Sequence, residues 1–280
     1  MMSDPFEVAL SYMGVRFQHD RYWAWEGLRP NIALLRDATS AGGWGGKAAT
    51  LGALLRAGLR VPTGIVGRGG AVHGFFCSRG LLDALLEAIP EARSTMPLVL
   101  RSSAVGEDGL KASFAGRYES YLNLYTTNEV VIAAKKIRES ATSERVMSYR
   151  RKMGLSGSAE LCVIMQRMII PSHSAVVFTR DPVSGSTDIV LELTEGTGDR
   201  LVGGEVEPAT WNYERAHDRL FHAAGPRTDA PSLQQLMDMA QECEAVIGAP
   251  ADVEAVFDGR VWWVVQARPI TTLEVGRLEP

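Results

Sequence analysis

The chain has 280 residues, of which 46% are hydrophobic and 22% are charged, and its net charge is −4. This composition is sufficient for one large or two modest globular domains, and the acidic balance excludes a strongly basic nucleic-acid-binding protein. We expect neither a membrane-spanning segment nor a signal peptide, because no apolar run has the required length or flanking charges. The three cysteines, Cys77, Cys162 and Cys243, are scattered and lack metal-binding spacing, so we expect reduced thiols in a cytoplasmic protein.

A glycine-rich turn opens the first stretch with a clear pattern. Residues 1–40 are of mixed composition, and we expect them to form an N-terminal cover segment. The turn at 41–46 leads into a helix predicted for 48–57, with Gly58 as its C-terminal cap. Lys47 falls in the first helical turn, where the backbone favours anions over cations. A phosphate held by Lys47 would explain its position, and a solvated lysine is the alternative.

A second candidate anion site lies at the end of a predicted buried strand, 98–103. Arg101 lies near the end of this strand, and a guanidinium group can hold a phosphate through two hydrogen bonds. A salt bridge from Arg101 to Glu107 or Asp108 is the alternative. The small residues that begin at Ala112 are typical of a loop whose backbone amides cover a triphosphate.

The middle of the chain alternates between helical and extended patterns. A helix with a charged, solvent-exposed face is predicted for 128–153. The apolar strand predicted for 160–170 contains Gln166, and the edge of such a strand offers backbone groups and apolar walls to an adenine ring. A plain core strand is the alternative. Residues 215–232 are polar and are predicted to form a loop before a helix at 232–247.

The last pattern, 252–270, predicts a β-hairpin with two apolar arms on either side of Asp258-Gly259. Four polar side chains occupy i, i+2 positions in its arms: Asp252, Glu254, Gln266 and Arg268. We expect a three-residue loop that pairs residue 256 with residue 260, because this register places all four side chains on one face. Two carboxylates, an amide and a guanidinium group suit Mg²⁺ bound to phosphate. A cross-strand ion pair is the alternative.

Six sequence blocks, in order between residues 41 and 272, resemble the nucleotide-binding domain of the pyruvate phosphate dikinase and phosphoenolpyruvate synthase family, which includes rifampicin phosphotransferase. The blocks are Gly-Gly-Lys-Ala at 45–48, Arg-Ser-Ser-Ala at 101–104, Ser-Phe-Ala-Gly at 113–116, Glu-Ser-Tyr-Leu-Asn at 119–123, Val-Ile-Met-Gln-Arg-Met at 163–168, and Gln-Ala-Arg-Pro-Ile-Thr at 266–271. One departure is Gly-Thr-Gly-Asp at 196–199, where the family has Gly-Leu-Gly-Glu.

The resemblance implies an α/β (α+β) fold, namely a two-lobed, ATP-grasp-like domain with the nucleotide in the cleft between its lobes. The first lobe would span 41–160 and the second 161–275, followed by a tail at 276–280. Three residues would contact the nucleotide phosphates and act in catalysis: Lys47, Arg101 and Arg268. Further nucleotide-binding residues would be Ser113, Ala115, Gly116, Ser120, Gln166, Met168 and Ile169. Mg²⁺ would be held by Glu254, Gln266 and Asp252.

The predicted function is therefore MgATP-dependent phosphoryl transfer of the dikinase type. The acceptor would be a histidine on a separate protein or domain, and we expect neither nucleic acid nor a membrane as partner. One alternative is a self-contained ATP-dependent kinase or ligase that acts on a small molecule. The other is a regulatory module that binds the nucleotide without turnover.

Overall fold

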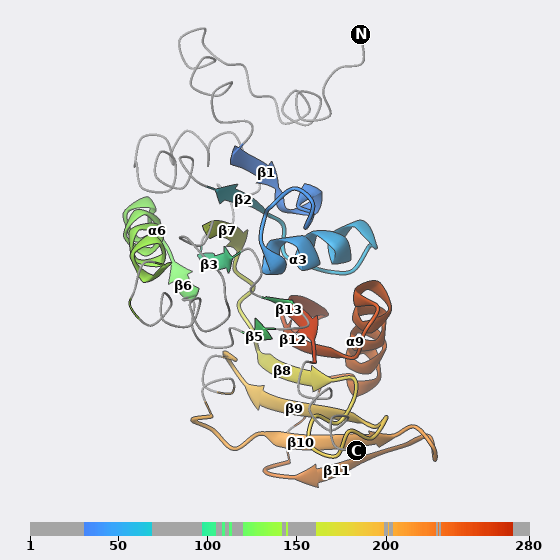
Figure 1. Ribbon diagram of the computed structural model, residues 1–280. Coiled ribbons are helices and arrows are strands. Elements are labelled where there is room, and N and C mark those ends of the chain that lie inside the picture. The colour runs from blue at the N-terminus through green and yellow to red at the C-terminus, as the bar shows by residue number, and fades with distance from the viewer. Residues whose placement is uncertain are drawn as a thin grey trace, which may run out of the picture. The chain divides into compact units, whose positions relative to one another are not determined.

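The structure is a computed structural model that describes residues 31–68, 97–104, 108–109, 112–113, 120–141, 144, 161–198, 201, 204–227, 229 and 231–270. It is a mixed α/β structure with two larger antiparallel sheets (Figure 1). The chain divides into two compact units. The described residues of the first unit lie within Met1–Gly45, Thr63–Val105 and Ala115–Met168, and those of the second within Gly46–Pro62, Gly106–Phe114 and Ile169–Pro280.

The two units interleave along the chain, whereas the lobes predicted from the sequence, 41–160 and 161–275, are each continuous. The helix that begins at Gly46 belongs to the second unit, and the strand that ends at Arg167 belongs to the first. The units follow from which strands and helices contact one another, and this depends on pairing between distant segments and not on their order in the sequence.

The first unit contains a five-stranded antiparallel sheet in the order β1-β2-β7-β3-β6. Its strands are β1 (Ile32–Leu34), β2 (Gly64–Arg68), β7 (Leu161–Arg167), β3 (Leu98–Ala104) and β6 (Ser120–Leu124). The short 3-10 helix η2 (Leu35–Asp37) contacts β2, and helix α6 (Thr127–Ala141) packs against β3, β6 and β7. The core between α6 and the sheet is aliphatic and includes Leu98, Leu100, Val130, Ala134, Ile137 and Met165.

The sheet of the first unit has a second face, which carries the polar residues. Side chains alternate along a strand, so Arg101 and Ser103 project from the side opposite to Leu98 and Leu100. In the register of β3 with β7, Ser103 lies opposite Cys162 and Val99 lies opposite Gln166. Arg101, Ser103, Cys162 and Gln166 therefore share the face that α6 does not cover.

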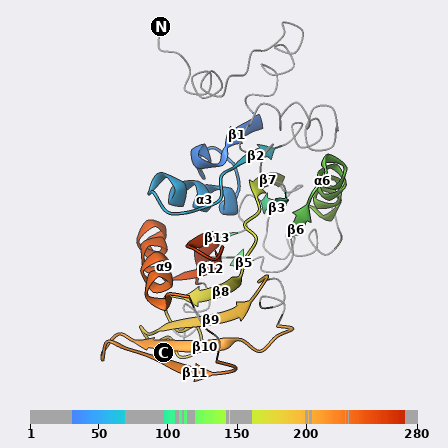
Figure 2. The same cartoon turned by 180° about the vertical axis from the view of Figure 1, so that it is seen from behind.

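The second unit contains a six-stranded antiparallel sheet in the order β11-β10-β9-β8-β12-β13. Its strands are β8 (His173–Phe178), β9 (Ile189–Glu195), β10 (Ala209–Glu214), β11 (Arg219–Ala224), β12 (Ala251–Phe257) and β13 (Trp262–Pro269). Helix α9 (Leu233–Ile247) lies beside β12, as both views show (Figures 1 and 2), and helix α3 (Gly46–Arg56) packs against β13 and α9. A two-stranded ribbon joins β4 (Asp108–Gly109) to β5 (Ala112–Ser113).

The structure confirms the two helices predicted in the second unit. α3 ends just before Gly58, whose φ of 90° is the left-handed conformation expected of a cap. At the start of α9, the Ser232 side chain accepts a hydrogen bond from the amide of Gln235. At its end, the amide of Gly248 donates to the carbonyl of Glu244 at 2.8 Å.

The prediction of a loop at 215–232 is wrong, because residues 219–224 form β11. This strand pairs with β10 and is half-buried or exposed along its length. Cross-strand contacts stabilise it, including the ion pair between Arg219 and Glu214 at 3.0 Å. An exposed edge strand of this kind lacks the apolar pattern that identifies buried strands.

Among the described residues, no helix is both long and apolar enough to cross a membrane.

Candidate active site

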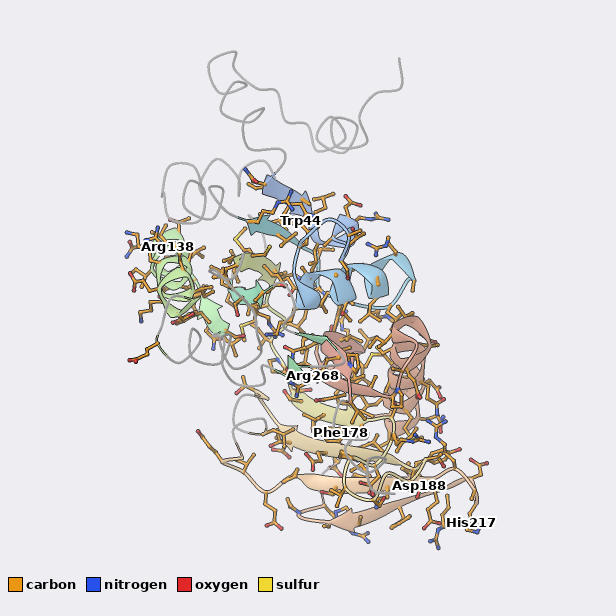
Figure 3. All side chains as sticks on the ribbon, in the orientation of Figure 1. Trp44, Arg138, Phe178, Asp188, His217 and Arg268 are labelled. Carbon is orange, nitrogen blue, oxygen red and sulfur yellow. The ribbon has the colours of Figure 1, made fainter. Side chains whose placement is uncertain are left out.

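The glycine-rich turn that precedes α3 is held by side chains on the polar face of the first sheet. Arg68 donates a hydrogen bond from Nη1 to the carbonyl of Gly42, and its guanidinium lies over the Trp44 ring, 4.5 Å from the ring centroid. Ser103 donates from Oγ to the carbonyl of Trp44 at 3.1 Å. The turn is therefore a fixed structure whose shape depends on the strands beneath it, and Figure 3 labels Trp44.

Gly45 shows how closely this turn approaches the sheet. Its φ of 81° lies in the left-handed region, which side chains rarely adopt. A Cβ atom at this position would overlap both the Oγ and the main-chain carbonyl of Ser103. Glycine is therefore required at residue 45 for two independent reasons.

Lys47 is the second residue of α3, as predicted. The first turn of α3 contains no acidic residue, and the first four amides of an α-helix have no acceptor within it. An anion is the natural ligand for such a helix end. α3 packs against β13, the strand that carries Gln266 and Arg268.

Three of the predicted nucleotide-binding residues lie on the sheet of the first unit. Arg101 pairs in register with Ser120 of β6 and with Ile164 of β7. Gln166 is 3% exposed, and its backbone and Cγ lie where a Cβ on Gly64 would have to be. The structure therefore brings Arg101, Ser120 and Gln166 onto neighbouring strands of one sheet.

The backbone of the predicted adenine hinge is partly engaged within the protein. The amide of Met168 donates to the carbonyl of Pro97 at 3.0 Å. The Met168 sulfur accepts from the amide of Asn123 at 3.2 Å. An adenine contact at this point would therefore use the carbonyl of Met168 or the amide of Ile169.

Part of the predicted triphosphate loop cannot be placed in this site. Ala115 and Gly116 lie outside the described residues. Ser113 is described only as the second residue of β5. Glu107, one of the alternative partners proposed for Arg101, also lies outside the described residues.

The hairpin of β12 and β13 forms as predicted, but the predicted register is wrong. Residue 256 was expected opposite residue 260, whereas Phe257 lies opposite Trp262 and residues 258–261 form the turn. The Asp258 carboxylate explains this longer turn, because Oδ1 accepts hydrogen bonds from the amides of Arg260 and Val261, at 2.8 and 2.9 Å.

A β-bulge nevertheless brings the four polar residues of the hairpin onto one face. Glu254 lies opposite Gln266, and the next residue, Ala255, lies opposite Val264, so Val265 is an extra residue in β13. Asp252, two residues before Glu254, lies opposite Arg268. If Val265 paired with Glu254 in a regular ladder without the bulge, Gln266 and Arg268 would project from the other face of the sheet.

Asp252 and Arg268 form the cross-strand ion pair that the sequence analysis gave as an alternative (Figure 3 labels Arg268). The Arg268 Nη2 and Nε atoms lie 2.7 and 2.8 Å from the same oxygen of Asp252, Oδ2. Among the described residues, no group of three or more histidine, cysteine or acidic side chains is arranged to hold a metal ion. Mg²⁺ commonly uses one or two protein oxygens together with phosphates and water, and Glu254 and Gln266 fit that requirement.

A further carboxylate on the same face was missed in the sequence analysis. Val176 of β8 lies opposite Glu254 on one side and opposite Glu192 of β9 on the other. Burial, and then the negative charge of Asp252, raise the pKa of Glu192. The only signal in the sequence was an acidic residue inside an otherwise apolar strand.

Comparison with known proteins places this chain in a family. Residues 77–227 match the family described as "Pyruvate phosphate dikinase, AMP/ATP-binding domain", which covers more than half of the chain. The chain belongs to this family. The protein carries an AMP/ATP-binding domain, and its two antiparallel sheets with their helices agree with the α/β class that the sequence predicted.

Three relatives illustrate the range of proteins to which this chain is similar. Prodigiosin synthesizing transferase PigC of Serratia marcescens is 31% identical over 282 residues, which covers 81% of this chain and 31% of PigC. A probable phosphoenolpyruvate synthase of Archaeoglobus fulgidus is 28% identical over 305 residues, which covers 84% of this chain and 40% of the synthase. Rifampicin phosphotransferase of Streptomyces sviceus is 30% identical over 221 residues, which covers 69% of this chain and 25% of the phosphotransferase. The chain thus spans between 25% and 40% of the length of these relatives.

Proposed function

We propose that the chain binds MgATP and performs the nucleotide-dependent part of a dikinase-type phosphoryl transfer. In this reaction a phosphoryl group passes from ATP to a histidine on a separate protein or domain. Family membership and the similarity to phosphoenolpyruvate synthase support this proposal. The observation that carries it is the bulged hairpin, which presents Glu254 beside Gln266 and the Arg268–Asp252 pair on one face.

The hairpin is the part of the chain that binds Mg²⁺ in this proposal. Glu254 and Gln266 hold Mg²⁺ through their oxygen atoms, and the metal supplies positive charge to the phosphates when it is bound. Asp252 fixes the orientation of the Arg268 guanidinium through Oδ2, and its second oxygen is the third candidate ligand.

The remaining roles are electrostatic and positional. Lys47, Arg101 and Arg268 bind phosphate oxygens and stabilise the charge that develops on the transferred group. Gln166 and the main chain at Met168 and Ile169 hold the adenine. Ser113, Ala115, Gly116 and the Ser120 hydroxyl are assigned to the triphosphate.

The products of ATP identify the reaction type. The purified chain is incubated with ATP and Mg²⁺, with and without the phosphohistidine domain of a related phosphoenolpyruvate synthase, and the nucleotides are identified by mass spectrometry. AMP and phosphate that appear only with the added domain support the proposal. ADP formation would instead favour the small-molecule kinase, and bound but unchanged ATP in every reaction would favour the regulatory module.

We also propose that the protein is cytoplasmic. Cys162 and Cys243 are both buried free thiols, which supports a reducing compartment. Burial, followed by the charge of Glu242, raises the pKa of Cys243 to about 12, so this thiol stays protonated and unreactive.

A further inference from the structure

The glycine turn of the first unit has an unusual set of supports. Three successive carbonyls, those of Gly42, Gly43 and Trp44, each accept a hydrogen bond from a side chain on the sheet. The donors are Arg68, Cys162 and Ser103, respectively, and the Cys162 sulfur lies 3.5 Å from the carbonyl of Gly43. Their partners lie 26, 119 and 59 residues away in the sequence, so only the folded sheet creates this arrangement.

The three donors form a row across the sheet. Arg68 of β2 lies opposite Cys162 of β7, and Cys162 lies opposite Ser103 of β3. Residues that are directly opposite in an antiparallel sheet project from the same face. The row therefore meets the turn from one side and draws its carbonyls towards the sheet.

The direction of the carbonyls fixes the direction of the amides. In a planar trans peptide the N–H of one residue points opposite to the C=O of the residue before it. The carbonyls of Gly43 and Trp44 point to the sheet, so the amides of Trp44 and Gly45 point away from it. Two consecutive amides with the same direction are suited to bind an anion.

Arg68 has the largest part in this arrangement. It contacts the turn through the carbonyl of Gly42 and through the face of the Trp44 ring. A guanidinium group that stacks on an indole while it donates a hydrogen bond fixes both the ring and the peptide beside it. Lysine has the charge but cannot make both contacts in the same geometry.

We propose that Arg68 is a positioning residue for nucleotide phosphates. It orients the turn at 42–45 so that the amides of Trp44 and Gly45 donate to the phosphates of the bound nucleotide, and Arg68 itself does not contact them. This inference rests on the proposed function, since it requires that the chain binds ATP.

The test compares ligands that differ only in their phosphates. Dissociation constants for ATP, ADP and adenosine are measured by calorimetry with the whole chain, for the wild type and for Arg68→Ala and Arg68→Lys. Arg138→Ala is the matched control, because Arg138 is an exposed arginine on α6 of the same unit. Arg68→Ala should weaken ATP and ADP about ten-fold and leave adenosine unchanged, and Arg68→Lys should recover part of the loss.

Each other outcome has a definite meaning. Equal losses for ATP and adenosine would overturn the inference, because they would show a general structural role for Arg68. Unchanged ATP affinity in Arg68→Ala would overturn it as well, while the proposed function would stand. A wild-type chain that binds no ATP would overturn the proposed function and this inference together.

Discussion

The polar faces of the two sheets are organised in different ways. In the first unit, side chains on three adjacent strands hold the main chain of a distant glycine turn. In the second unit, side chains meet each other across neighbouring strands, as Asp252 and Arg268 do. The first arrangement shapes a set of backbone amides, whereas the second presents side-chain ligands directly. Substitutions in the first unit should therefore act through the shape of the turn, and those in the hairpin through the loss of a ligand or an ion-pair partner.

The largest expected effect is that of Glu254→Ala on the hairpin. This change removes the carboxylate opposite Gln266, and Mg²⁺-dependent turnover of ATP, measured with the added phosphohistidine domain, should fall by at least about 100-fold. Circular dichroism should show an intact fold, and Glu242→Ala, which changes an exposed carboxylate on α9, is the control. Turnover that is unchanged in Glu254→Ala would refute its metal role.

A pair of glycine substitutions compares the two units directly. Gly45 of the turn and Gly259 of the hairpin both have positive φ, 81° and 92°. A Cβ on Gly259 would meet no atom within 4 Å, so Gly259→Ala should cost only backbone strain, about 1–2 kcal/mol of unfolding free energy. Gly45→Ala adds an overlap with Ser103 and should cost about 2–4 kcal/mol, as measured by urea unfolding.

Nucleotide affinity should separate the same two variants. Gly45→Ala should also weaken ATP binding, because it displaces the turn, whereas Gly259→Ala should leave binding unchanged. If the two variants changed stability and affinity equally, the distinction between the turn at Gly45, which packs against the sheet, and the turn at Gly259, which does not, would be contradicted.

The Asp252–Arg268 pair should have a moderate effect on stability. Asp252→Asn removes the negative charge that faces the half-buried guanidinium of Arg268, and we expect a loss of about 1–3 kcal/mol in the free energy of unfolding. A double-mutant cycle with Arg268→Gln measures the interaction between the two residues. A coupling energy near zero would show that the ion pair contributes nothing to the hairpin.

The smallest effect is expected from Glu192, and it depends on pH. Its pKa is raised above the ordinary value of 4.5, so the folded chain holds a proton that the unfolded chain has released. The stability of the protein should therefore fall as pH rises from 4.5 through the raised pKa. Glu192→Gln should remove this part of the pH dependence and raise the melting temperature at neutral pH more than at acidic pH. Identical pH profiles for the two proteins would contradict this prediction.

The sequence was a good guide to the hairpin and a poor guide to its register. The i, i+2 spacing of Asp252 and Glu254 was enough to predict a shared face, and the structure has that shared face. The turn depends on a carboxylate that accepts two amides, at Asp258. The bulge depends on Val265, which is one apolar residue in an apolar run and carries no sign of its role.

The residues that support the glycine turn could not be predicted from the sequence, for a different reason. Lys47 and its helix follow from local spacing, and the structure confirms the helix. Arg68 contacts Gly42, 26 residues away, only in the folded unit, and nothing local to Arg68 indicates this. Glu192 was missed for the same reason, since it joins the hairpin face only through the pairing of β8 with β9 and β12.

Direct binding of MgATP tests the central claim most simply. Calorimetric titration of the whole chain with ATP, with and without Mg²⁺, should show one saturable site whose affinity falls about ten-fold or more when Mg²⁺ is removed. The same titration of Glu254→Ala should show no dependence on Mg²⁺. A wild-type chain that binds no ATP, or binds it equally well without the metal, would contradict the account.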